Sequence, residues 1–206
     1  MGLIRVLLLL VLVATPAWAA PVVRVHLVSV SGPYALTLPV RRALRAKLRE
    51  VGVRLRVTRV THIPDSAPWL SGIADMRRRF FHWEGESYRR KWRRGVDLVH
   101  VMLPPVLEYG NSYVSGLAVV CSKFGVSFVT ETNRLGENRY EHSLCAMAHE
   151  ISHSLGANHH DTTENLMHGD ALHWVDHWLT GSRDFMAICP LPYEVGAIRE
   201  IRGCLT

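Results

Sequence analysis

The chain has 206 residues, of which 48% are hydrophobic and 20% charged, and its formal net charge is +6. This composition is that of an ordinary globular protein, so it excludes disordered and fibrous chains, and the length predicts one domain. The modest basic excess is compatible with acidic partners but does not require them.

The first 20 residues are predicted to be a secretory signal peptide. Arg5 precedes an apolar stretch over Val6–Val13, and Ala17–Ala19 offers a cleavage site between small residues. This stretch is too short for a membrane anchor, and no other apolar run is long enough to span a bilayer. We therefore expect residues 21–206 to form one exported domain, secreted or, in a Gram-negative bacterium, periplasmic.

Four cysteines lie in the predicted mature part: Cys121, Cys145, Cys189 and Cys204. An even number of cysteines in an exported protein favours two disulfides. Four cysteines allow three pairings, and their spacing alone does not choose among these.

The mature part opens with a predicted strand, helix and strand. Val22–Val30 alternates apolar and polar residues, Leu38–Val51 carries apolar residues at helical spacing, and Val53–Val60 alternates strictly. Gly52 is predicted to end the helix. Such a unit in about forty residues indicates two parallel strands joined by a crossover helix.

Ile73–Arg94 combines aromatic residues with runs of Arg and Lys, after a loop over residues 61–72. One interpretation is a surface helix with Tyr88 and Trp92 packing inward and the arginines in solvent. The other is a site for nucleic acid or another anionic surface. No nucleic-acid-binding fold motif accompanies the segment, so we favour the first interpretation and expect no nucleic-acid partner.

Three further strands are predicted before the second long helix: Val96–Leu103, Val114–Cys121 and Val126–Thr130. Pro104 and Pro105 end the first of them. With the two strands of the opening unit, the sequence predicts five strands in all.

The helix predicted from about Tyr140 carries the chemical motif of the chain. His149 and His153 are four residues apart, so both rings project from one helical face and can bind one zinc ion. Glu150 lies beside the first histidine, where a carboxylate acts as general base toward water. A histidine-rich surface helix is the alternative, and the five fixed positions of HExxHxxGxxH argue against it.

The third ligand of this motif lies beyond the helix. Gly156 is predicted to end the helix with a positive φ, so that His159 can complete the ligand set and leave one position for water. The neighbouring His160 and Asp161 are predicted to face solvent or to brace the turn. Asp161 is also a candidate to accept a hydrogen bond from a ligand histidine or from local backbone amides.

The sequence HEISHSLGANH over residues 149–159, followed by Met167, resembles the metzincin zinc endopeptidases. The order of predicted elements and local matches such as Gly116–Ala118 and Met147–Glu150 are most similar to the adamalysins (reprolysins). The spacing from His159 to Met167 is short, as in matrixins.

This resemblance implies an α/β (α+β) metzincin fold with a twisted, mixed five-stranded sheet, helices and a zinc-binding helix. The upper lobe would span about residues 21–156. A small, mostly irregular lower lobe over about 157–206 would carry Met167 in a Met-turn under the metal and a final helix over Val195–Ile201.

The resemblance also bears on the cysteines. In adamalysin-like domains a cysteine placed like Cys121 pairs with one near the C-terminus, which implies Cys121–Cys204 and leaves Cys145–Cys189. The second bridge would tie the zinc-binding helix to the lower lobe. Gly169 stands where some metzincins have a tyrosine, so a tyrosine ligand is not expected.

Two segments are candidates for substrate binding. Val114–Val119 is predicted to be an edge strand that pairs with an extended peptide. Ala171–Trp178 is apolar and aromatic, and it forms either a wall of the substrate pocket or ordinary core packing. His173 and His177 have the spacing of a metal pair but lack a third ligand.

The sequence therefore predicts a secreted, monomeric zinc metalloendopeptidase that acts on protein or peptide substrates. One Zn²⁺ would be bound by His149, His153 and His159, and Glu150 would be the catalytic general base. The alternative is a secreted, zinc-stabilised binding protein for an anionic surface or a partner protein, with little or no proteolysis. The presence of Glu150 argues against that alternative.

Overall fold

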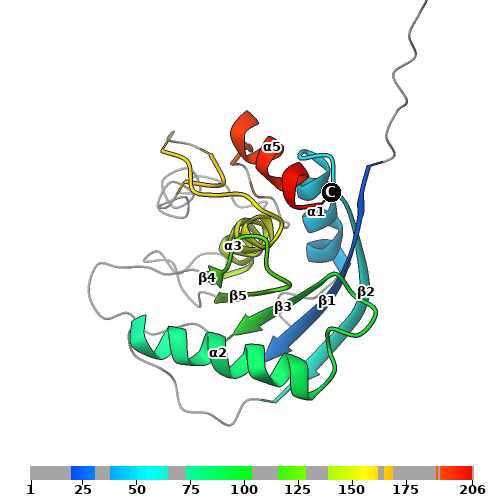
Figure 1. The fold of residues 1–206 in the computed structure, drawn as a ribbon, viewed down its shortest axis with the longest axis vertical. Helices are drawn as coiled ribbons and strands as arrows, with labels where there is room; N and C mark the ends of the chain where they lie inside the picture. Colours follow the sequence, from blue (N-terminus) through cyan, green and yellow to red (C-terminus); the bar gives the residue numbers. More distant parts are fainter. Residues whose placement is uncertain are drawn as a thin grey trace, which may run out of the picture.

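The computed structural model describes residues 20–30, 38–64, 73–103, 116–128, 139–161, 165–168, 189 and 191–205. Within these residues the chain forms a five-stranded sheet with helices on both faces (Figure 1). The predicted signal peptide except its last residue, the candidate pocket segment over 171–178 and Gly169 lie outside the described residues.

The sheet is mixed, with the strand order β2-β1-β3-β5-β4. The strands are β1 (Val22–Val30), β2 (Arg54–Ile63), β3 (Leu98–Leu103), β4 (Gly116–Ala118) and β5 (Phe124–Phe128). β1 pairs in parallel with β2 and β3, β3 pairs in parallel with β5, and β4 pairs antiparallel with β5. The predicted mixed five-stranded sheet and the predicted parallel opening unit are confirmed.

The helices cover the two faces of this sheet. They are α1 (Leu38–Arg49), α2 (Ile73–Arg89), α3 (Arg139–Ser154) and α5 (Val195–Cys204). In Figure 1, α1, α3 and α5 lie on one side of the sheet, and α2 lies on the other. Among the described residues, none of the helices is long and apolar enough to cross a membrane.

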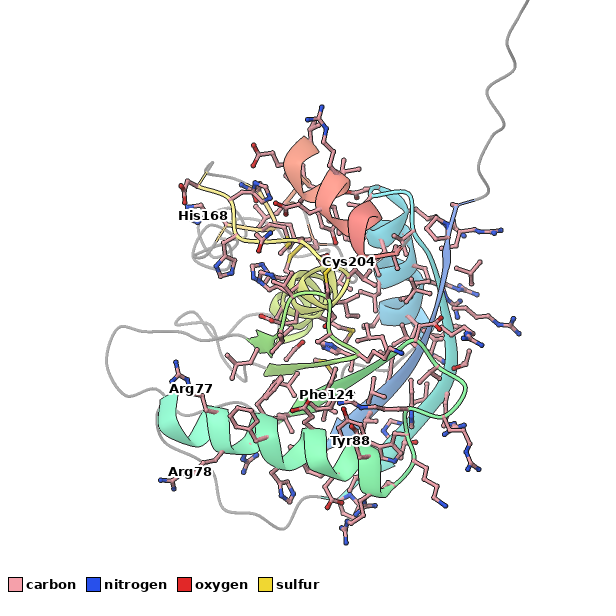
Figure 2. All side chains as sticks on the ribbon, viewed as in Figure 1. Arg77, Arg78, Tyr88, Phe124, His168 and Cys204 are labelled. Carbon is pink, nitrogen blue, oxygen red and sulfur yellow. A yellow bond between two sulfur atoms is a disulfide. The ribbon has the colours of Figure 1, made fainter. Side chains whose placement is uncertain are left out.

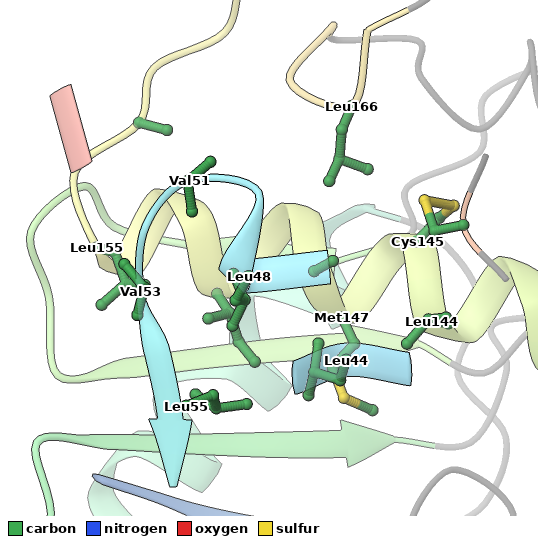
Figure 3. Packing of buried hydrophobic residues seen from close by; sticks show 14 of the residues in the cluster. Leu44, Leu48, Val51, Val53, Leu55, Leu144, Cys145, Met147, Leu155 and Leu166 are labelled. Carbon is green, nitrogen blue, oxygen red and sulfur yellow. A yellow bond between two sulfur atoms is a disulfide. The ribbon is translucent and has the colours of Figure 1, made fainter. Parts of the chain in front are cut away.

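Two hydrophobic cores follow from this layering, because side chains alternate between the two faces of a strand. Leu98 and Met102 of β3 belong to the core under α1, α3 and α5, whereas Val99 and Val101 belong to the core under α2. Figure 3 shows Leu44 of α1 beside Met147 of α3 in the first core. The central strands are therefore buried on both faces, which explains their nearly continuous apolar sequence.

Several element ends differ from the sequence prediction, and the ends of β2 and α2 have an evident cause. β2 continues to Ile63 because it pairs with β1 as far as Val30. α2 ends at Arg89, five residues early, because Lys91 adopts a φ of 56° and turns the chain. α1 ends at Arg49, two residues before the predicted end, and Gly52 has a φ of 75° in the turn that follows it.

The aromatic residues of the basic segment divide between core and surface. Phe80 and Trp83 are buried under the sheet, and Trp92 joins them from beyond the helix end, as predicted. Tyr88 is 62% exposed, so the prediction that it packs inward is wrong. Residue 88 lies roughly 140° around the helix from Trp83, and its ring instead lies 3.8 Å from the Arg93 guanidinium.

Both disulfides implied by the family resemblance form. Cys121–Cys204 joins the turn between β4 and β5 to the end of α5. Cys145–Cys189 joins α3 to the chain that precedes α5. The two bridges thus connect the C-terminal part of the chain to the sheet and to α3.

A buried histidine in β3 makes stability depend on pH. Burial lowers the pKa of His100 to about 3, whereas an unfolded chain protonates its histidines below about pH 6.5. The unfolded state therefore binds more protons, and the free energy of unfolding falls by about 1.4 kcal/mol per pH unit on acidification below that pH. We expect His100→Gln to remove this part of the slope, measured by urea unfolding across the pH range.

His62→Gln is the matched control, because His62 is exposed on β2. This variant should keep the parent slope. A His100→Gln slope equal to that of the parent between about pH 6 and 4 would contradict the assignment.

Candidate metal centre

The zinc-type motif lies on α3, and the helix ends where the sequence predicts. Gly156 adopts a φ of 119°, and its N–H donates to the His153 carbonyl at 2.9 Å. The Ala157 N–H reaches back to the Ser152 carbonyl at 2.9 Å. These two bonds are the Schellman pattern of a glycine-terminated helix, and they direct the chain back toward the face that carries the histidines.

The structure brings the three predicted ligands together. The Nε2 atom of His149 lies 3.0 Å from Nε2 of His153 and 3.2 Å from Nε2 of His159. Two nitrogens bound to one tetrahedral zinc ion lie about 3.3 Å apart. The three side chains are also the one group of metal-ligating residues found among the described residues.

The opposite ring nitrogens determine which atoms are free to bind a metal. Nδ1 of His149 lies 2.6 Å from the Leu166 carbonyl, and Nδ1 of His153 lies 2.7 Å from the Ala157 carbonyl. A carbonyl only accepts, so both Nδ1 atoms carry the proton and both Nε2 atoms present a lone pair. Lone pairs that converge without a proton between them repel each other, and a bound cation removes that repulsion. The donor set therefore fits a zinc ion.

The protonation state of the rings also fits a metal. Burial, with the nearby His153 and His159, lowers the pKa of His149 to about 3. Burial likewise lowers the pKa of His153. At neutral pH both rings are therefore neutral, which is the form that binds a metal.

Glu150 occupies a dry position beside the ligands. Its side chain is buried, and burial raises the pKa of its carboxyl well above the usual range. The carboxylate lies against the backbone of Gly116 in β4, where an added Cβ would lie 2.6 Å from Cδ of Glu150. A side chain at residue 116 would displace the carboxylate, so the glycine allows Glu150 to take this position.

A tight turn lies beside the ligands at Met167, as predicted. Met167 is fully buried, and its N–H donates to Oδ1 of Asn165 at 2.7 Å. The carbonyl of Met167 accepts the N–H of His160 at 3.0 Å. The residue before Met167 supplies the carbonyl that orients His149, so this turn holds both ends of the ligand set.

The loop that carries His159 is held by α5. Glu200 accepts the N–H of Asn158 at 2.8 Å, and its carboxylate lies 3.2 Å from Nε2 of His160. The other nitrogen of His160 lies 3.4 Å from Glu194. The ring rests on Gly196, where a Cβ would lie 2.5 Å from it. His160 therefore braces the turn, one of the two roles predicted for it.

The sequence that forms this site matches a known protein family. The profile of the metallo-peptidase family M12B (reprolysin-like) matches residues 40–160. The chain belongs to this metallopeptidase family. The match covers α1 to the third predicted ligand, so the family relationship includes the whole HExxHxxGxxH pattern.

Solved structures share the fold. Archaemetzincin from Methanopyrus kandleri is 15% identical and has a TM-score of 0.57, with 93% of this chain and 98% of that chain covered. A zinc-dependent peptidase from Methanocorpusculum labreanum is 16% identical and has a TM-score of 0.53, with coverages of 88% and 100%. Metalloproteinase-II from Bacteroides fragilis is 15% identical and has a TM-score of 0.52, with coverages of 91% and 54%.

At these identities the likeness extends to the fold alone. It supports the mixed α/β, zincin-like fold expected from the sequence. Comparison with curated proteins finds no match for the sequence.

Several positioning groups have no signal in the sequence. The carbonyls of Ala157 and Leu166 are backbone atoms, which every residue has, and Asp161 is exposed and does not take their place. The role of Glu200 depends on how α5 packs. The role of Gly116 was open to prediction, because a glycine inside a strand often marks a close approach.

The loop contact of Glu200 leads to a test of metal affinity. Glu200→Ala removes the acceptor that holds Asn158 and His160, and we expect zinc affinity to fall about tenfold, as for other groups that orient ligands. Glu200→Gln keeps an acceptor oxygen, so its zinc affinity should lie between those of the parent and Glu200→Ala. Competition with a chromogenic chelator measures the affinity.

Arg199→Ala is the control, because Arg199 lies on the same helix and is exposed. It should bind zinc as the parent does. Equal affinity in the parent and Glu200→Ala would show that α5 does not hold the ligand loop.

The contact of Gly116 leads to a test of the Glu150 position. The added methyl group of Gly116→Ala would overlap with the Glu150 carboxylate and displace it. A displacement of about 1 Å lowers kcat/KM about a hundredfold, so we expect a loss of that size. Zinc content, measured by atomic emission, should stay unchanged because no ligand moves. Gly85→Ala is the control, since nothing lies within 4 Å of a Cβ there, and a similar loss in both variants would refute the contact.

Proposed function

We propose that this metallopeptidase is a secreted zinc endopeptidase in which Glu150 is the general base. One observation supports the proposal most directly: the lone pairs of His149 and His153 converge with His159 beside a buried carboxylate. Three histidines with one adjacent acid are the protein part of a hydrolytic zinc site.

The roles of the side chains follow from their chemistry. A bound zinc ion would activate a water molecule and polarise the carbonyl of the scissile bond. Glu150 takes the proton of the attacking water and passes it to the leaving amine. Burial raises the pKa of the Glu150 carboxyl, which makes its carboxylate a stronger base toward water.

The edge strand β4 is a suitable guide for a peptide substrate. β4 lies at the end of the sheet and pairs with β5 on one side. Gly116 of the same strand contacts Glu150. An extended peptide that adds to the sheet next to β4 would therefore pass the catalytic carboxylate, with affinity supplied by main-chain hydrogen bonds.

The two disulfides support export, because such bonds persist in oxidising compartments. The predicted signal peptide leads to the same conclusion. A monomeric state and the assignment to an adamalysin or matrixin-like subgroup remain predictions. The alternative of a binding protein without proteolysis leaves the buried position of Glu150 beside the ligands without a role.

Glu150→Gln tests the mechanism. The amide has nearly the same shape but cannot take a proton, so we expect kcat for peptide hydrolysis to fall by about 10² to 10⁴. Zinc content should stay at one ion per chain, since no ligand changes. Cleavage of a peptide library followed by mass spectrometry, with and without a chelator, measures activity, metal dependence and specificity together.

Glu50→Gln is the control, because Glu50 follows the end of α1 and pairs with Lys47 rather than with a predicted ligand. It should cleave at the parent rate. Parent-level cleavage by Glu150→Gln would refute the general-base role. Chelator-resistant cleavage by the parent would refute zinc dependence.

A further inference from the structure

The positive charge of the protein is concentrated in one segment. Residues 77–94 contain eight Arg or Lys and two Glu, a net charge of +6, which equals the formal net charge of the whole chain. The remaining residues therefore balance to zero. This segment comprises α2 from Arg77 onward and the turn that follows, and the metal centre uses none of it.

The exposed face of α2 carries basic and aromatic side chains together. Seven exposed residues fall within roughly 140° of the helix circumference, and they are Arg77, Arg78, Phe81, His82, Gly85, Tyr88 and Arg89. The Phe81 and Tyr88 side chains are 66% and 62% exposed, and they lie two helical turns apart. No residue of this face is acidic.

The two acidic residues of the segment lie at the margins of this face and are paired. Glu86 accepts hydrogen bonds from Arg89 at 2.7 Å and from Arg90 at 2.8 Å. Glu84 lies 3.2 Å from Arg93. Within the part of the chain that the structure describes, Arg77 and Arg94 have no salt bridge.

The face lies away from the metal centre. α2 packs on the opposite side of the sheet from α3 (Figure 1). Figure 2 shows Arg77 and Arg78 projecting from one end of the helix, with Tyr88 toward the other end. A partner on this face is therefore separated from the ligands by the sheet.

We propose that this face of α2 docks the protein on an anionic membrane surface. Arginines attract acidic headgroups, and an exposed phenylalanine inserts among them at the boundary of the acyl chains. Gly85 leaves space for a headgroup between the two aromatic rings, because nothing lies within 4 Å of a Cβ there. The exposed Phe81 ring matches the apolar layer beneath lipid headgroups, so we assign the face to a bilayer rather than to a soluble polyanion.

Vesicle sedimentation tests the proposal without any need for peptidase activity. The parent should bind vesicles of equal parts phosphatidylcholine and phosphatidylglycerol, release them as NaCl rises, and not bind phosphatidylcholine alone. Arg77→Gln/Arg78→Gln should bind more than about tenfold more weakly, since each arginine contributes about fivefold. Arg94→Gln changes the turn after α2, and its affinity for these vesicles should fall about fivefold.

Arg42→Gln/Arg49→Gln is the matched control, because it removes the same charge from exposed positions of α1. It should bind vesicles nearly as the parent does. If both double variants lost vesicle affinity equally, net charge alone would explain the binding, and the proposal would be overturned. All these variants should hydrolyse a short soluble peptide at the parent rate, so the outcome is independent of the proposed catalytic mechanism.

Phe81→Ala separates a bilayer from a soluble polyanion. This variant should bind vesicles about fivefold more weakly, because an aromatic ring no longer inserts. Its affinity for heparin and for single-stranded DNA should equal that of the parent. Vesicle binding that is unchanged in Phe81→Ala, or binding of heparin or DNA without any binding of vesicles, would overturn the membrane assignment.

Discussion

The metal centre depends on two hydrogen bonds from imidazole rings to backbone carbonyls. His149 donates to Leu166 and His153 donates to Ala157, and each bond keeps the proton on Nδ1 so that Nε2 faces the metal position. Neither carbonyl belongs to α3. One follows the glycine that ends the helix, and the other lies in the turn at Met167. The ligand set is therefore complete only when the chain beyond α3 has folded back beneath it, which couples the metal site to the C-terminal part of the fold.

Close backbone approach is the second constraint on this site. Gly156 lies against Cys204, where a Cβ would be 2.5 Å from the sulfur, and Gly116 lies against Glu150. The first contact lets α5 reach the ligand loop, and the Cys121–Cys204 bridge fixes α5 to the turn after β4. The same helix then holds the loop through Glu200. The Glu150 carboxylate, the ligand loop and the edge strand are thus connected through short contacts that side chains larger than hydrogen would prevent.

The features predicted from sequence are those that depend on local geometry. The spacing of His149 and His153 defines one helical face whatever the tertiary structure, and Gly156 ends its helix through bonds within six residues. The strands were equally predictable, because their alternation of apolar and polar residues is also local. Tyr88 was misplaced because helical spacing from Trp92 assumed a helix that continues to residue 94, whereas Lys91 ends it. The hold of Glu200 on the ligand loop was not readable at all, since it depends on how a distant helix packs.

The basic face of α2 and the metal centre lie on opposite sides of the sheet, and this separation has a functional consequence. The core under α2 lies between the basic face and the sheet, while the ligands lie beyond the other face. Contacts made by Arg77 and Phe81 therefore change neither the ligand geometry nor the environment of Glu150. Docking through α2 acts on encounter rather than on chemistry: it raises the effective concentration of the enzyme near substrates held on the same surface. Because this contribution is electrostatic, it decreases with ionic strength, whereas hydrolysis of a soluble peptide does not depend on it.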